Sequence, residues 1–113
     1  MGNVNSEIEM ANVFELQGLD LTSEVMECLV STEYIRIERI VSNGQCSPDG
    51  FWYDQTEHEW VVLLSGAATI EFDAGRTVSL KPGDYLNIPA HKKHRVAETA
   101  LDAQTLWLAV FYT

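Results

Sequence analysis

Residues 59–66, EWVVLLSG, and residues 83–94, GDYLNIPAHKKH, decide the fold class of this chain. The first segment holds an apolar, partly β-branched run that ends at a glycine, which is typical of a buried β-strand. The second follows Lys81 and Pro82, so it starts in a tight turn, and its short strand is closed by Pro89. Both segments therefore predict short strands that are ended by turns.

The sequence around these segments has the same character. Between them lie two short runs of β-forming residues, joined at Asp73-Ala74-Gly75, which favours a hairpin turn. Another turn signal, Asn43-Gly44, follows a stretch in which apolar and polar residues alternate with a period of two. Because no helical pattern follows residue 31, we predict an all-β fold, a single antiparallel β-barrel or jelly roll. The predicted strands cover residues 33–41, 60–64, 68–72, 77–80, 85–88, 95–98 and 105–112.

The N-terminal part of the chain has a different pattern. In residues 23–30, SEVMECLV, the side chains of Val25, Met26 and Leu29 share one helical face, and Thr22 or Ser23 could cap it. We therefore expect a short N-terminal helix. Residues 1–12 are polar and are predicted to form a flexible segment, which precedes a barrel domain of residues 13–113.

Alternation along the strands separates an inward face from an outward face. The last strand is apolar on both faces, so Trp107, Phe111 and Tyr112 should leave apolar area for a second copy, and we expect a homodimer. The inward set is predicted as Ile37, Val61, Leu63, Ile70, Phe72, Leu86, Ile88 and Leu108, or their neighbours if the register slips by one residue.

Composition argues against several kinds of partner. The 113 residues include 17 acidic and 7 basic ones, for a formal net charge of −10, which disfavours binding to nucleic acid. No apolar run approaches membrane-spanning length, so we expect no membrane partner. Cys28 and Cys46 match no zinc-ligand spacing, and no signal-peptide pattern is seen, so we expect a cytoplasmic protein with reduced thiols.

The two opening segments resemble the two motifs of the cupin superfamily, commonly written G-x5-H-x-H-x3–4-E-x6-G and G-x5-P-x-G-x2-H-x3-N. Residues 59–66 fit E-x6-G, and residues 83–94 fit G-x5-P with a histidine five residues later. The resemblance covers residues 34–112 and is to small, single-domain cupins of the bacterial type. It implies a jelly-roll-like barrel, often a homodimer, whose inward residues can hold one metal ion. It implies no particular reaction, because cupins include enzymes, binding modules and storage proteins.

The chain departs from the family pattern where the two motif histidines should stand. With four residues before Glu59, these positions fall on Trp52 and Asp54; with three, they fall on Tyr53 and Gln55. Both alignments remain open, and neither supplies a histidine. In the second motif, His91 replaces the family glycine and Glu98 the family asparagine.

The metal ion that the resemblance implies requires three or four nitrogen or oxygen donors. Glu59 and His94 occupy family ligand positions, and Asp54 could add an oxygen. His58 or Gln55 could complete the set, although neighbouring strand residues such as 58 and 59 face opposite sides unless a bulge intervenes. Such a set would suit Fe, Mn, Zn or Ni.

The residues around these candidates predict a pocket near the mouth of the barrel. Its walls are expected to include Trp52, Tyr53, Gln55 and His91. Two functions follow: a metal-dependent enzyme of the oxygenase or isomerase type that acts on a small organic molecule, or a non-catalytic module that binds such a molecule with a degenerate or empty metal site.

Overall fold

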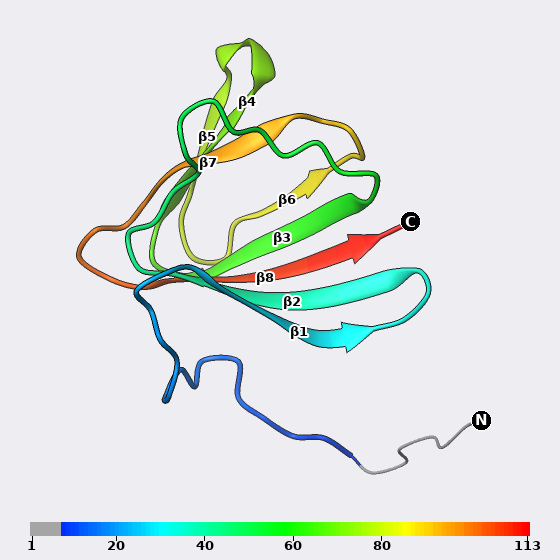
Figure 1. Ribbon diagram of the computed structural model, residues 1–113, viewed down its shortest axis with the longest axis vertical. Helices are drawn as coiled ribbons and strands as arrows, with labels where there is room; N and C mark the ends of the chain where they lie inside the picture. The colour runs from blue at the N-terminus through cyan, green and yellow to red at the C-terminus, as the bar shows by residue number, and fades with distance from the viewer. Residues whose placement is uncertain (1–7) are drawn as a thin grey trace.

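Eight antiparallel strands form two sheets in the computed structural model, which describes residues 8–113 (Figure 1). A five-stranded sheet has the order β1-β2-β8-β3-β6, and a three-stranded sheet has the order β5-β4-β7. The strands are β1 (Val25–Ser31), β2 (Ile35–Ser42), β3 (His58–Ser65), β4 (Ala68–Phe72), β5 (Thr77–Leu80), β6 (Tyr85–Ile88), β7 (His94–Thr99) and β8 (Thr105–Tyr112). The only helical element of the described residues is one 3₁₀ turn, η1 (Asp73–Gly75), in the β4–β5 hairpin.

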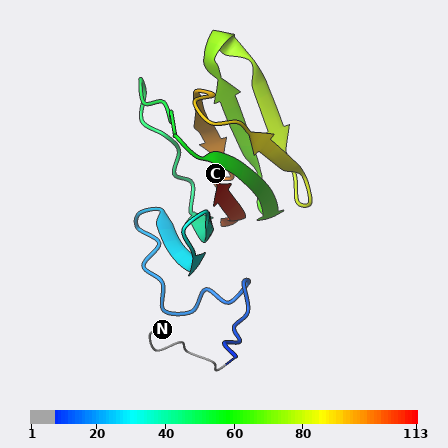
Figure 2. The same ribbon diagram turned by 90° about the vertical axis from the view of Figure 1, so that its right-hand side faces the viewer.

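The two sheets face each other as in a jelly roll, with the five-stranded sheet below the three-stranded one in Figure 1. The same arrangement is visible from the side in Figure 2. Strand β8 lies at the centre of the larger sheet, between β2 and β3, which explains why its sequence is apolar on both faces. The predicted all-β jelly roll is therefore confirmed.

The hydrophobic core lies between the sheets and matches most of the predicted inward set. Val61, Leu63, Ile70 and Ile88 are buried there, and Phe72 and Leu86 pack against them. For β8 the alternative with a one-residue slip of the register holds. The core side chains of that strand are Trp107, Ala109 and Phe111, and Leu108 lies on the outer face. Ile37 is also outward, because its neighbours Arg36 and Glu38 line the interior.

The predicted N-terminal helix is wrong, because residues 25–31 form the edge strand β1. This strand pairs with β2, but Leu29 is an extra residue between Cys28, opposite Glu38, and Val30, opposite Ile37. Such a β-bulge interrupts the period of two. The apolar residues on either side of it therefore fall at spacings that imitate a helical face.

The glycine that ends the first motif is required by a close approach of two strands. Gly66 has a φ of +87°, and a Cβ atom at this position would lie 2.6 Å from the Thr105 Cα of β8. A side chain here would meet both backbone strain and a backbone clash. The motif glycine thus fixes how β3 leaves the sheet beside the start of β8.

The described part of the segment before β1, residues 8–24, lies beyond the edge strand β1 in Figure 1. Arg39 on β2 donates hydrogen bonds to the backbone carbonyls of Val13 and Glu15, at 3.1 and 2.6 Å, and pairs with Glu27. Of the N-terminal segment 1–12, residues 1–7 lie outside the described part of the chain. Over residues 8–113, no helix has the length and apolar character needed to span a membrane.

Candidate functional site

A cavity of about 330 Å³ lies between the two sheets. Its apolar wall comes from β3, β4, β6, β7 and β8, which contribute core side chains such as Val61, Ile70 and Trp107. Its polar wall comes from the residue before β1, from β2, from the segment that leads into β3, and from the first residues of β3 and β7. The polar side chains are Glu24, Arg36, Glu38, Tyr53, Gln55, Glu57, Glu59 and His94.

Glu59 and His94 converge in this cavity, as their motif positions predict. The Glu59 Oε1 and His94 Nε2 atoms are 3.4 Å apart, and the side chains are 13% and 6% exposed. The His94 Nδ1 lies 2.8 Å from the Lys92 carbonyl, which only accepts, so Nδ1 carries a proton and Nε2 faces the carboxylate. Burial alone would lower the pKa of His94, but the hydrogen bonds to Glu59 and Lys92 and the charge of Glu59 raise it.

Two alignments are possible for the positions where the family motif has its histidines. The facing of alternate residues in the segment before β3 decides between them. The side chains of Tyr53, Gln55, Glu57, Glu59 and Val61 all line the cavity, so the odd-numbered residues face inward. Tyr53 and Gln55 therefore stand where the family has its two histidines. The Tyr53 ring also stacks on the His94 ring at 5.4 Å, and burial, followed by the charges of Glu24 and Glu59, raises the pKa of the phenol.

The even-numbered candidates of this segment are not brought into the cavity. Asp54 is exposed and pairs with the exposed His91, with 2.8 Å between Oδ1 and Nδ1. His58 accepts a hydrogen bond from the Ala90 backbone at 3.0 Å. Trp52 is not among the residues that line the cavity. His91 has a φ of +64°, the left-handed conformation that favours the glycine of the family motif.

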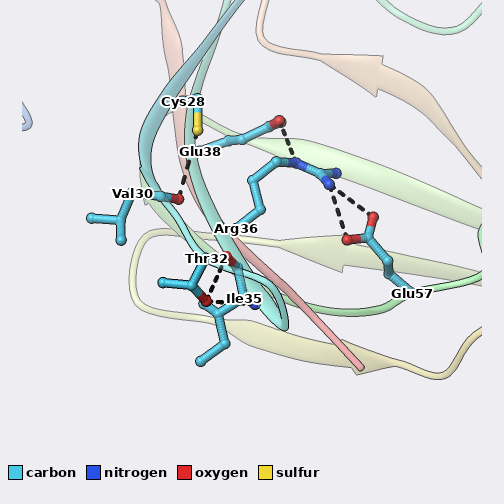
Figure 3. Close-up of polar contacts among 7 residues, drawn as sticks. All are labelled: Cys28, Val30, Thr32, Ile35, Arg36, Glu38 and Glu57. Atoms are coloured by element: carbon cyan, nitrogen blue, oxygen red, sulfur yellow. Dashed lines mark hydrogen bonds and ion pairs between the residues drawn. The ribbon is translucent and has the colours of Figure 1, made fainter. Parts of the chain in front are cut away.

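An ion-pair network that the sequence did not predict borders the cavity. The Arg36 guanidinium donates through Nε to Glu38 at 2.8 Å and through Nη1 to both carboxylate oxygens of Glu57 at 2.9 Å (Figure 3). Its Cζ atom lies over the Phe111 ring, 4.3 Å from the ring centroid. Alternation along the sequence could have indicated this network. Residues 36 and 38 face the same side of their strand as Ile40, and residue 57 faces the same side as Glu59.

The sequence profile of the cupin domain family matches residues 41–111. The chain belongs to the cupin family. It is 42% identical to a candidate mannose-6-phosphate isomerase from Ralstonia eutropha JMP134, whose crystal structure matches with a TM-score of 0.87 over 93% of this chain and 98% of that one.

More distant cupins share the fold alone. A cupin superfamily protein from Desulfitobacterium hafniense DCB-2 is 20% identical, with a TM-score of 0.69 over 83% of this chain and 81% of that chain. An RmlC-like cupin from Desulfovibrio desulfuricans is 19% identical, with a TM-score of 0.71 over 93% and 97%. No curated protein matches the chain.

The donor set of this cupin does not fit a resident metal ion. A tightly held divalent metal needs at least three protein ligands, and Glu59 and His94 supply two. Tyr53 and Gln55, at the two family histidine positions, are a neutral phenol and a neutral amide. Among the described residues, no group of three or more His, Cys, Asp or Glu side chains is arranged to hold a metal.

Proposed function

We propose that this cupin binds a small organic molecule in its barrel cavity without a metal ion, with Glu59 and His94 as the polar anchor. The observation that carries the proposal is the convergence of these two side chains, 3.4 Å apart, on a cavity of about 330 Å³ with apolar walls. A few fixed polar groups in a largely apolar cavity are the usual composition of a small-molecule site. This is the binding-module hypothesis of the sequence, with the metal site degenerate.

The experiment is an NMR screen of small organic compounds of different charge against the ¹⁵N-labelled protein. We expect some compounds to shift the amide signals of Gln55, Glu59 and His94 and to leave Ser79, on the outside of the three-stranded sheet, unchanged. The metal content of the same sample should be far below one ion per chain. Stoichiometric metal, or no compound of any charge that shifts the cavity signals at millimolar concentration, would overturn the proposal.

A second candidate function, proton transfer to or from the bound molecule, is favoured by the orientation of His94. The Lys92 carbonyl fixes the proton on Nδ1, so Nε2 is the atom that exchanges a proton beside Glu59. Such a pair would remove and return a carbon-bound proton of the ligand. The test is hydrogen–deuterium exchange of a bound compound in D₂O, followed by NMR. Exchange that depends on the protein and is lost in Glu59→Gln, while binding is retained, would support catalysis.

We also propose that the chain forms a homodimer, although of the three residues that the sequence indicated only Tyr112 shares the outward phase of Leu108 and Val110. Trp107 and Phe111 are buried within the chain and cannot serve as the interface. The outer face of the five-stranded sheet remains apolar, and an antiparallel sheet that meets water on one side is normally polar there. This face is formed by half-buried side chains in neighbouring strands and by Tyr85, which is 63% exposed. The half-buried side chains are Ile37, Trp60, Val62, Leu108 and Val110.

The dimer is tested by sedimentation of two variants at micromolar concentration. Leu108→Asp places a charge in the middle of the outer apolar face, and we expect it to sediment as a 12.7 kDa monomer. Ser79→Asp is the matched control on the exposed outside of the three-stranded sheet and should sediment at twice that mass, like the unmodified protein. A monomeric unmodified protein would refute the dimer.

A further inference from the structure

We infer that the ligand of the cavity is a small organic cation, a protonated amine or quaternary ammonium ion with an apolar body. The inference rests on the proposed function, because it names the ligand class of the same cavity. It follows from three features of the cavity: an excess of negative charge, a carboxylate that has no countercharge among the described residues, and aromatic side chains in the wall.

The ionisable side chains of the cavity leave an excess of negative charge. Four carboxylates line it, and among the described residues only Arg36 and His94 are lining side chains that can carry a positive charge. The Nε and Nη1 atoms of Arg36 are already bonded to Glu38 and Glu57. With His94 protonated beside Glu59, two negative charges remain, and with His94 neutral, three remain. An anionic ligand such as a sugar phosphate would add to this excess.

Glu24 is the cavity carboxylate that forms no ion pair with any cation of residues 8–113. Its Oε2 accepts a hydrogen bond from Ser42, a buried hydroxyl, at 2.9 Å, which holds the side chain in place. Glu24 also lies beside Tyr53 at the wall between the main cavity and a smaller one of about 210 Å³. A fixed, partly buried carboxylate at the side of an apolar cavity is a suitable counter-ion for an ammonium group, since screening by water is reduced there.

Aromatic side chains supply a second, independent attraction for a cation. Trp107 is 4% exposed and lines the cavity, and Tyr53 lines it on the side of Glu24. The faces of aromatic rings attract ammonium groups, and tryptophan does so most strongly. Phe111 already makes this contact with Arg36, which shows that the same wall accepts a cation. The buried Trp107 indole N–H has no hydrogen-bond partner within residues 8–113.

The test compares matched compounds of the same shape and different charge by NMR titration. Choline is paired with its neutral isostere 3,3-dimethylbutan-1-ol, and benzylamine with benzyl alcohol; benzoate and mannose 6-phosphate are the anions. We expect each cation to bind about tenfold more tightly than its neutral partner, as one ion pair and one cation–π contact would give. Binding of the cations should weaken between 50 and 500 mM salt.

Two charge-removing variants separate the cavity from the general acidity of the chain. Glu24→Gln keeps an oxygen for Ser42 and should reduce the preference for cations at least about threefold. Glu33→Gln removes one exposed charge outside the cavity and should leave the preference unchanged. Neutral or anionic compounds that bind as tightly as the cations would overturn the inference and leave the proposed function standing. Failure of every compound, whatever its charge, would overturn both.

Discussion

Replacing Glu59 by glutamine removes the negative charge that faces His94 and changes the shape of the site very little. In the unmodified protein the folded state raises the pKa of His94, so folding is favoured by protonation of this residue. The stabilisation is therefore fully present below the ordinary histidine pKa of about 6.5 and is lost as the pH rises through the raised value. Glu59→Gln should lower the pKa of His94, because burial then acts without the countercharge.

The size of the effect follows from the geometry of the pair. Two unit charges 3.4 Å apart attract by about 5 kcal/mol at an effective dielectric constant of about 20. Desolvation of two side chains that are 6% and 13% exposed offsets part of this attraction. The net contribution of a hydrogen bond between charged groups is about 1.5–3 kcal/mol. We therefore expect Glu59→Gln to lower the free energy of unfolding by about 2 kcal/mol at pH 5.5.

At pH 9.5 the same substitution should cost close to nothing. The neutral His94 ring keeps its proton on Nδ1, which donates to Lys92, and Nε2 is then an acceptor that faces the Glu59 carboxylate, another acceptor. The glutamine amide can donate to Nε2 where the carboxylate cannot. The difference in stability between the variant and the unmodified protein should therefore disappear at high pH.

The assay is urea denaturation of both proteins at pH 5.5 and 9.5, with the pKa of His94 followed by NMR. Glu71→Gln is the control, because Glu71 pairs with Arg95, which stays charged over this range. Its cost should be equal at both pH values. A loss of stability in Glu59→Gln that does not change with pH, or a His94 pKa that rises in this variant, would refute the reasoning.

Two further predictions follow from the backbone and from the surface pair. Gly66→Ala should lower the free energy of unfolding by about 2 kcal/mol or more in thermal or urea unfolding, because its Cβ would clash with Thr105. Gly50→Ala, at φ +80° with nothing within 4 Å, is the control and should cost only about 1 kcal/mol. Equal losses in the two variants would show that the close approach of Gly66 to Thr105 is not strained. Asp54→Ala should change the free energy of unfolding by less than about 0.5 kcal/mol and leave ligand affinity unaltered, because its pair with His91 is exposed. A large loss of affinity in a binding titration would show that Asp54 belongs to the binding site.

The strands and turns of the barrel could be predicted because local chemistry determined them. Alternation placed β2 through β8 nearly at their observed bounds, and turn residues such as Pro82-Gly83 marked where the strands end. The β1 strand escaped prediction because the bulge at Leu29 breaks its alternation, and pairing with β2 outweighs the local helical spacing. The face of β8 could not be chosen from sequence, because both faces of this central strand are apolar and only its partners decide.

The candidate site could be predicted where the alternate residues of one strand all face the cavity. The positions of Glu59 and His94 in the cavity followed from the two motifs. Asp54 and His58 were candidates because their side chains can bind a metal, but these even-numbered residues do not line the cavity. Arg36 and Glu57 meet across 21 residues of sequence, and Glu24, directly before β1, reaches Ser42 at the end of β2. Contacts of this kind depend on how β1, β2 and the segment before β3 come together in space. A local sequence pattern does not predict this arrangement.

The central claim, binding of a small organic molecule without a metal ion, is tested most directly by calorimetric titration of chelator-treated protein. Benzylamine or another compound that shifts the cavity signals is titrated into the metal-free protein, and then into protein supplied with one equivalent of Fe(II), Mn(II), Zn(II) or Ni(II). We predict one binding site per chain and the same affinity in every titration. Binding that appears only after a metal is added would contradict the account.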